Sequence, residues 1–485
     1  MKKEIIPINY NFKGFSRWCT NEIELNRAFS KKHKELLRFN LTDNTWYYFD
    51  DTQWVPDKGC AVTRQYAEQF ISQLVEYAEL SGHDSAFAKF VRKYYNVNKR
   101  ESLIRDAEKN CTFFSEDLNT DTKQFNCQNG TFDFRDLSFR PHNPDDMISK
   151  ISNVTYNPDA KSEEFENFID EITLGNAGLK NFLQKILGYS LTGDTEWDKC
   201  FILYGPTSRN GKTTLLENIR FLMGGSGGYA MSTTPETFAE TKRNSGQPSE
   251  HIARLQGCRF LITSEIPQNM FLNSSLLKQL TGKDTITARF LYGSTYEFIP
   301  QFKLFFCTNY LPIVTDSSVF DSGRMLVIPF NRHFKTEEQD KELPERLRSP
   351  ENISGIFNWL VEGYKKYLAE GLTIPSAVRE ATEDFRKKVE GLGKTSDGTK
   401  KPNESIERFL TERLEICDGC NILAKDVYKE YVKWCHENNG FDMGKSLFYS
   451  ELRDRSLLSD TGTIAGLTKN NVIKGYRFKD KKRAA

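Results

Sequence analysis

The chain has 485 residues, which exceeds one hydrophobic core and, at about 150 residues per domain, predicts roughly three domains. Its 67 Lys and Arg residues nearly balance 66 Asp and Glu residues, so the net charge of +1 gives no overall attraction to nucleic acid. The aromatic share of 13% excludes wholesale disorder, and no apolar run approaches the roughly 18 residues of a membrane span. We therefore expect a globular, cytoplasmic protein in which any basic surface is local.

Residues 1–125 combine short aromatic runs with helical periodicity, which predicts a mixed α/β region whose role the residues do not indicate. A strand is expected at residues 45–49 and a helix at residues 66–80. Asp50 and Asp51 could be read as a metal-binding pair. Their place between two aromatic runs favours turn carboxylates exposed to solvent.

The ten cysteines are scattered through a chain without a secretion signal, so we expect reduced thiols. Cys417 and Cys420 have the C-x-x-C spacing of a zinc site, and Cys435 follows. Cys435, however, lies on the apolar face of a predicted helix, and a second pair with zinc-site spacing is missing. A structural role is the favoured interpretation.

Further along, the sequence predicts a hairpin, helices and then a mostly parallel sheet. Asn129-Gly130 is a turn signal, and helical periodicity follows at residues 165–187, so we expect a hairpin and helical collar over residues 126–198. Apolar strands then alternate with helices over residues 199–345, which is typical of an α/β core. The expected strands lie at residues 200–204, 259–263, 303–308 and 325–330. We expect a helical extension over residues 346–390, a linker over 391–403 and a last domain over 404–485.

The strongest local pattern is a phosphate-binding loop after the first of these strands. The loop ends in Gly211-Lys212-Thr213, and an amphipathic helix begins there. Backbone N–H groups would face the phosphates, Lys212 would reach the outer ones, and the Thr213 hydroxyl would ligate Mg²⁺. Pro206 stands where the consensus has glycine, with Gly205 one residue earlier. The predicted ATP-binding residues are Gly205, Asn210, Gly211, Lys212, Thr213 and Thr214.

Three further residues at strand ends suggest hydrolysis. Glu265 follows the strand at residues 259–263 and is expected to organise Mg²⁺ or polarise the attacking water. Asn309 follows the strand at 303–308 and could position that water. Arg324 precedes the strand at 325–330 and could face the nucleotide of a neighbouring subunit, although a plain surface role stays open.

Together these motifs resemble superfamily 3 helicases of the phage and plasmid primase-helicase group, relatives of the poxvirus primase-helicase. The resemblance covers residues 126–334 and includes, beside the phosphate loop, residues 129–142, 187–194, 277–289 and 302–309. It implies an AAA+ P-loop ATPase core, ATP with Mg²⁺, and a homohexameric ring moving 3′ to 5′ on single-stranded DNA. It also implies replication of a phage or plasmid in a bacterial cytoplasm, beside a separate primase or polymerase, with no membrane.

The resemblance places a DNA-contacting hairpin at about residues 286–298, for which Lys283, Arg289 and Tyr292 are the candidates. A purely structural role for this hairpin stays open. The family often has an arginine pair where this chain has Gly323-Arg324, so Arg324 alone carries the finger assignment. The last domain is expected to be winged-helix-like, with a basic end that contacts fork DNA. Two alternatives remain: a bifunctional primase-helicase, and an origin-binding initiator that uses ATP for assembly.

Overall fold

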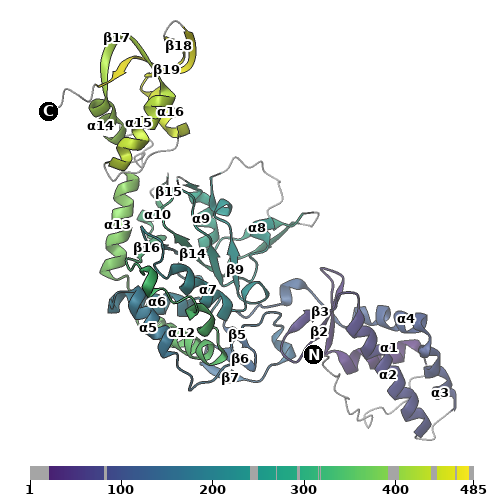
Figure 1. The fold of residues 1–485 in the computed structure, drawn as a ribbon. Helices are drawn as coiled ribbons and strands as arrows, with labels where there is room; N and C mark the ends of the chain where they lie inside the picture. Colours follow the sequence, from purple (N-terminus) through teal and green to yellow (C-terminus); the bar gives the residue numbers. More distant parts are fainter. Residues whose placement is uncertain are drawn as a thin grey trace. The chain divides into compact units, whose positions relative to one another are not determined.

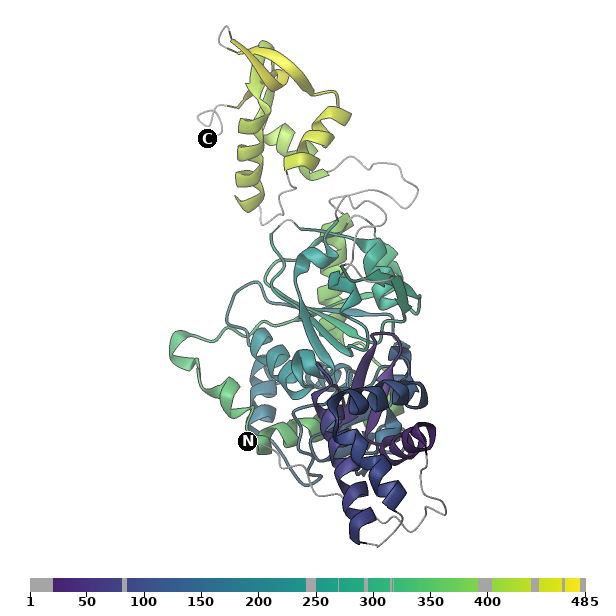
Figure 2. The same ribbon diagram turned by 90° about the vertical axis from the view of Figure 1, so that its right-hand side faces the viewer.

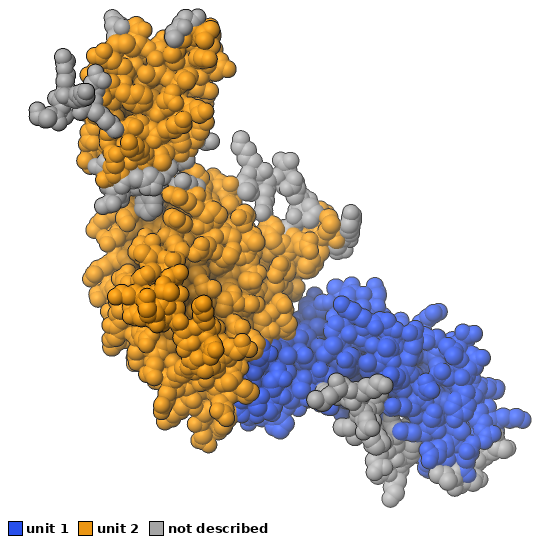
Figure 3. All heavy atoms as spheres, viewed as in Figure 1, with its two compact units in different colours: residues 1–156 blue, residues 157–485 orange. Residues whose placement is uncertain are grey.

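The computed structural model describes residues 21–80, 85–240, 250–268, 270–291, 295–314, 316, 318–390, 404–437, 445–464 and 467–479. The chain divides into two compact units, residues 1–156 and 157–485 (Figure 3). The predicted domain boundaries, of which the first falls after residue 125, stay predictions. Within the described ranges, no helix has the length and apolar character needed to cross a bilayer.

The first unit packs a four-stranded sheet against helices. Strand order is β3-β2-β1-β4, with β4 parallel to β1 and the other pairs antiparallel. Its core contains Phe29, Phe70 and Ile104 from three different helices. The elements are α1 (Glu22–His33), β1 (Leu37–Asn40), β2 (Thr45–Phe49), β3 (Trp54–Pro56), α2 (Ala61–Leu80), α3 (Ser85–Arg92), α4 (Val97–Ala107) and β4 (Thr112–Phe113) (Figure 1).

Two sequence predictions for this unit are confirmed. The Asp50 carboxylate accepts hydrogen bonds from the backbone N–H groups of Thr52 and Gln53, as a turn residue does. The turn at Asn129-Gly130 joins two strands of a three-stranded antiparallel sheet, in which Cys127 pairs with Gly130. These strands are β5 (Gln124–Cys127), β6 (Gly130–Asp133) and β7 (Ser138–Arg140).

A five-stranded, wholly parallel sheet forms the centre of the second unit (Figure 2). Its order is β16-β8-β14-β10-β9. The strand of this sheet that comes first in the sequence, β8, therefore lies between the two that come last, β14 and β16. The predicted α/β fold class is therefore confirmed. The strands are β8 (Cys200–Tyr204), β9 (Ala230–Thr233), β10 (Phe260–Thr263), β14 (Lys303–Thr308) and β16 (Met325–Pro329).

Helices cover both faces of this sheet because its strands are apolar on both sides. Ile202 and Leu304 share one apolar cluster with residues of α9, α10 and α13. Phe201 and Phe305 point to the other face and stack with ring centroids 5.0 Å apart, and Phe182 of α6 lies 6.3 Å from Phe201. The helices of this part are α5 (Glu163–Ile172), α6 (Ala177–Tyr189), α7 (Lys212–Leu222), α8 (Glu250–Ala253), α9 (Ser274–Thr281), α10 (Ser318–Asp321), α11 (Leu343–Arg346), α12 (Pro350–Glu370) and α13 (Ser376–Glu390).

Two small paired elements complete this part of the unit. β11 (Phe271–Leu272) pairs in parallel with β15 (Ile313–Val314). β12 (Ile286–Arg289) and β13 (Thr295–Phe298) form an antiparallel hairpin in which Ile286 lies opposite Phe298. The structure thus contains a hairpin over the range that the sequence predicts.

The chain from α14 onward has the element order of a winged helix. A helix, a strand, two helices and two strands follow one another, and the sheet order is β17-β19-β18. Phe409, Tyr431 and Phe448 meet in its core. The elements are α14 (Glu404–Arg413), β17 (Leu414–Leu423), α15 (Ala424–Glu437), α16 (Lys445–Asp454), β18 (Leu458–Ile464) and β19 (Leu467–Phe478).

The cysteine prediction is wrong at one place in this winged-helix part. Cys417 and Cys420 form a disulfide where the pairing of β17 with β19 is interrupted between Ile416 and Asn421. The local irregularity brings their Cα atoms to 5.4 Å, which is within disulfide range. Cys435 is a buried free thiol, and no cluster of three or more metal-ligating residues occurs in the described ranges.

Helices α6 and α12 approach each other closely because glycines face the partner's backbone. A Cβ atom added to Gly188 would lie 2.3 Å from the backbone carbonyl oxygen of Leu360. One added to Gly363 would lie 2.0 Å from the backbone carbonyl oxygen of Gln184. Both separations are far inside contact distance, so no side chain fits unless the helices separate.

We predict that Gly363→Ala lowers the stability of the chain by about 3 kcal/mol, since overpacking outweighs the higher helix propensity of alanine. Gly227→Ala is the matched control, because open space surrounds its added methyl group. Urea unfolding followed by circular dichroism measures both variants. Equal midpoints for the two would contradict the close-packing explanation.

Candidate nucleotide site

The loop between β8 and α7, for which the sequence predicts a phosphate site, places two glycines against neighbouring atoms. Gly211 caps the amino end of α7 with φ of +83°, and an added Cβ would lie 2.5 Å from the Ile172 side chain. Gly205 also has no room for a side chain, because its Cβ would lie 2.8 Å from the Phe330 carbonyl oxygen. The glycine requirement is therefore met at position 205, which explains how Pro206 can occupy the consensus position.

The backbone of this loop offers donors to an anion. Within the described chain, no hydrogen bond from a backbone N–H of residues 207–214 is found, including the first amides of α7. Free amides at a helix amino end attract negative charge, and the helix dipole adds to this effect. The loop thus fits the phosphate groups of a nucleotide.

Lys212, Asn309 and Glu265 form a continuous chain of hydrogen bonds at the carboxyl edge of the sheet. The Lys212 ammonium donates to the Oδ1 atoms of Asn210 at 2.9 Å and of Asn309 at 2.8 Å. Asn309 Nδ2 donates to Glu265 Oε1 at 2.7 Å. Burial lowers the pKa of Lys212 below its ordinary value. Three residues predicted from separate motifs are therefore brought together.

Thr213 lies on the same edge, facing a cavity of about 640 Å³ that Glu265 also lines. Its hydroxyl lies 3.5 Å from the Cys307 sulfur, and burial raises the pKa of that thiol. His251 of α8 and Arg254, directly after this helix, line the same cavity. No local sequence pattern singles out these two residues, because their position depends on packing between distant parts of the chain.

A second cavity, of about 910 Å³, flanks the loop on the side of Gly211 and Thr214. Phe168 of α5 and Phe334 provide aromatic walls, and Arg209 contributes a cation. The sequence predicts Phe168 as part of an apolar helical face, and no local pattern singles out Phe334. Their place beside the loop follows from the packing of α5 against Gly211.

Arg324 does not join this group of residues. It precedes β16 at the amino edge of the sheet, where Met325 pairs with Cys200. Its guanidinium donates to the Lys278 carbonyl oxygen and the Thr281 hydroxyl at the end of α9, and forms an ion pair with Asp198 at 2.9 Å. Within its own chain Arg324 therefore holds the end of α9.

The predicted DNA-contacting residues lie in and before the β12–β13 hairpin. Lys283 is exposed, and Arg289 at the end of β12 is half-buried. Tyr292, at the expected tip, lies outside the described residues. Phe290 and Leu291, which lead to this tip, are exposed apolar residues.

Two protein families match two successive parts of the chain. Residues 25–174 match the family described as D5 N terminal like, and residues 203–324 match a family of unknown function, DUF5906. The second match contains the phosphate loop, Glu265, Asn309 and Arg324.

Viral proteins named as helicases or primases are similar over much of the chain. One, named helicase L207/L206, from Acanthamoeba polyphaga mimivirus, is 25% identical over 82% of this chain and 44% of its own length. Another, named helicase 022R, from Frog virus 3, is 32% identical over 50% of this chain and 25% of its own length. A protein of African swine fever virus named primase C962R is 21% identical over 56% of this chain. The similarity of the chain to these proteins supports a primase-helicase-like family.

The chain spans less than half the length of these relatives. Among solved structures, the C-terminal region of NrS-1 aligns over 94% of this chain and all of that chain, with 10% identity and a TM-score of 0.44.

Replacing Gly211 tests the geometry of the loop between β8 and α7. We predict that Gly211→Ala weakens ATP binding at least tenfold, since a methyl group would collide with Ile172 at a left-handed φ. Gly225→Ala is the matched control: Gly225 also has a positive φ, of +56°, but its added Cβ would meet only Arg220 at 3.6 Å. Titration with a fluorescent ATP analogue measures both. Wild-type affinity in Gly211→Ala would show that this loop does not hold the phosphates.

Proposed function

We propose that this chain is an ATP-driven DNA helicase or translocase of the superfamily 3, AAA+ type. The observation that carries the proposal is the connected group of Lys212, Asn309 and Glu265 at the edge of a parallel sheet. Names of viral relatives as helicases and primases support the same class of activity. The chain would work as a homohexameric ring that moves 3′ to 5′ on single-stranded DNA at a replication fork.

ATP and Mg²⁺ suit the donors and acceptors at this edge. The loop amides and the Lys212 ammonium would hold the phosphates, while the Thr213 hydroxyl and the Glu265 carboxylate are the oxygen ligands that Mg²⁺ prefers. When bound, the ion would neutralise charge on the phosphates. Both partners of Lys212 are neutral amides, so its ammonium is not already neutralised by a hydrogen-bonded carboxylate.

Glu265 and Asn309 would prepare the attacking water. A carboxylate can polarise a water, and an amide bound to that carboxylate can fix its direction toward the terminal phosphorus. The hydrogen bond between Asn309 and Glu265 already holds the two side chains in one orientation. The cavity lined by Phe168 and Phe334 is wide enough for the nucleoside and offers aromatic surfaces to its base.

Arg324 would complete the nucleotide site of the adjacent subunit. It lies at the start of β16, whereas the phosphate loop follows the end of β8, and these parallel strands of five residues span about 16 Å. Arg324 therefore cannot reach its own Lys212 site without a large rearrangement. In a ring, one subunit's amino edge can face the nucleotide of the next, and the guanidinium would then stabilise transition-state charge.

The hairpin and the winged-helix part would contact DNA. Lys283 and Arg289 would follow the phosphate backbone without reading sequence. In the winged-helix part, Arg477 already pairs with Glu415 at 2.6 Å and Lys479 donates to the Thr411 carbonyl. Lys474 is an exposed cation on the same strand, and the predicted basic end beyond residue 479 lies outside the described residues. The winged-helix part is also the observation that favours the alternative of an origin-binding initiator.

Loss of the Lys212 ammonium or the Glu265 carboxylate is expected to abolish hydrolysis. We predict that Lys212→Ala and Glu265→Gln each lower single-stranded-DNA-stimulated ATP turnover at least about 100-fold, since each removes a group that acts on the phosphates or the water. Lys212→Ala should also lose ATP binding, whereas Glu265→Gln should keep it. Arg220→Ala, a change on the outer side of α7 where Arg220 pairs with Glu217, is the control. Turnover that does not respond to single-stranded DNA in the wild type would contradict the helicase proposal.

Mixing inactive variants tests the shared site. We predict that Arg324→Ala and Lys212→Ala are each inactive, and that mixing them restores part of the ATPase activity, because some interfaces then combine an intact loop with an intact arginine. Asp198→Asn separates this role from packing, since it weakens the ion pair of Arg324 and keeps the guanidinium. It should stay active. Inactive mixtures, together with a lowered melting temperature in Arg324→Ala, would assign Arg324 to fixing α9 only.

A further inference from the structure

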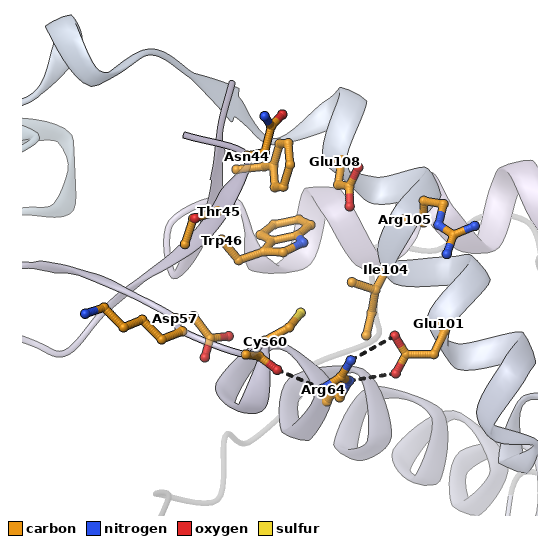
Figure 4. Close-up of a pocket in the computed structure, with 13 residues that line it drawn as sticks. Asn44, Thr45, Trp46, Asp57, Cys60, Arg64, Glu101, Ile104, Arg105 and Glu108 are labelled. Carbon is orange, nitrogen blue, oxygen red and sulfur yellow. Dashed lines mark hydrogen bonds and ion pairs between the residues drawn. The ribbon is translucent and has the colours of Figure 1, made fainter. Parts of the chain in front are cut away.

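A pocket of about 560 Å³ opens in the first unit, within that unit alone (Figure 4). Trp46 comes from β2, and Ile104 and Arg105 come from α4, with Glu108 directly after this helix. Figure 4 shows Trp46 on one side of the pocket and Ile104, Arg105 and Glu108 on the other. The volume lies within the range of small-molecule sites.

Several charges around the pocket are already used by the fold. Arg64 donates to both carboxylate oxygens of Glu101, at 2.7 and 3.3 Å, and to the Gly59 carbonyl oxygen. The Asp57 carboxylate accepts from the N–H groups of Val62 and Thr63 at the start of α2. These residues form the frame of the pocket and leave little capacity for a ligand.

The indole N–H of Trp46, in contrast to these groups, is not used in a hydrogen bond by the described part of the chain. Trp46 is only 4% exposed, and its Nε1 atom is buried without a hydrogen-bond partner among the described residues. The nitrogen is turned toward the wall formed by Ile104 and Glu108 (Figure 4). Trp54, in the same unit, is 1% exposed but donates its N–H to the Pro144 carbonyl at 2.8 Å. An unmatched buried donor is costly to a fold, so the Trp46 N–H is a candidate for an acceptor on a ligand.

Three charged groups around the pocket are not tied into the frame. Lys58 and Arg105 are exposed cations for which no ion pair is found within the described ranges. Glu108 is partly buried, and this burial raises the pKa of its carboxyl. A ligand suited to these groups has a flat ring with an acceptor for the indole and a donor for Glu108. It also has an anionic group for the two cations.

We propose that this pocket binds a nucleotide, with the base against Trp46 and Ile104 and the phosphate at Lys58 and Arg105. Cytosine has this pattern, because its N3 atom is an acceptor directly beside the exocyclic amino donor at C4. The nucleotide would be either free or part of a single strand, since both present the same base and phosphate. This site is separate from the ATP site and does not depend on hydrolysis.

The test uses the full chain carrying Lys212→Ala, without ATP, so that a failure of the ATPase proposal does not affect it. Deoxycytidine monophosphate, followed by saturation-transfer NMR, represents the free nucleotide. A fluorescein-labelled twenty-residue deoxycytidine strand, followed by anisotropy, represents the strand. The variants are Trp46→Phe, which keeps the ring and removes the N–H, and Arg105→Gln. Arg92→Gln, an exposed arginine outside the pocket, is the matched control.

We expect that each of the two variants, Trp46→Phe and Arg105→Gln, weakens the binding of at least one probe by about tenfold. Trp46→Phe should leave the melting temperature unchanged, because its N–H has no partner in the free protein. Trp54→Phe should show the reverse, a lower melting temperature with unchanged binding. An effect on the monophosphate indicates a free nucleotide, and an effect on the strand alone indicates DNA. Wild-type binding of both probes in both pocket variants would overturn the proposal.

Discussion

The parallel pairing of β8, β10 and β14 is the constraint on which the candidate nucleotide site depends. Tyr204 of β8 lies opposite Thr308 of β14, so Gly205 and Asn309 leave the sheet at the same level. Thr263 of β10 lies opposite Phe306, which places the segment that leads to Glu265 beside them. A shift of one residue in either pair would turn alternate side chains to the opposite face of the sheet. The contacts of Lys212 and Glu265 with Asn309 could not then form.

Local patterns were sufficient for much of this arrangement. The strand, loop and helix around Lys212 follow from apolar runs and from the Gly-Lys-Thr motif, and the ends of β10 and β14 identify Glu265 and Asn309. That these residues meet follows from a general property of parallel sheets, whose carboxyl ends share one edge. Positions that depend on distant packing could not be predicted this way. Phe334, Arg254 and the contacts of Arg324 at the end of α9 are of this kind.

The departure at Pro206 shows why spacing alone is an incomplete guide. The need for glycine is a need for space, and that space is defined by the carbonyl of Phe330 and the side chain of Asn210, which lie against residue 205. Neither neighbour is adjacent in sequence to the position that they restrict. The environment of a side chain in the first unit depends on distant residues in the same way. Trp46 and Trp54 both lie in short strands, and the sequence does not distinguish their indole groups. Only their surroundings determine which indole N–H is satisfied.

Asn309 links the two charged residues of the nucleotide site through a single amide group. Its oxygen accepts from Lys212 and its nitrogen donates to Glu265, so the side chain cannot turn over without losing both bonds. An anion that draws the Lys212 ammonium away would free the oxygen of Asn309 but leave its nitrogen on the carboxylate. The amide would then be held from one side, and Glu265 would gain freedom to reorient. The same three side chains, which contact one another in the free protein, would therefore connect a bound phosphate directly to the carboxylate.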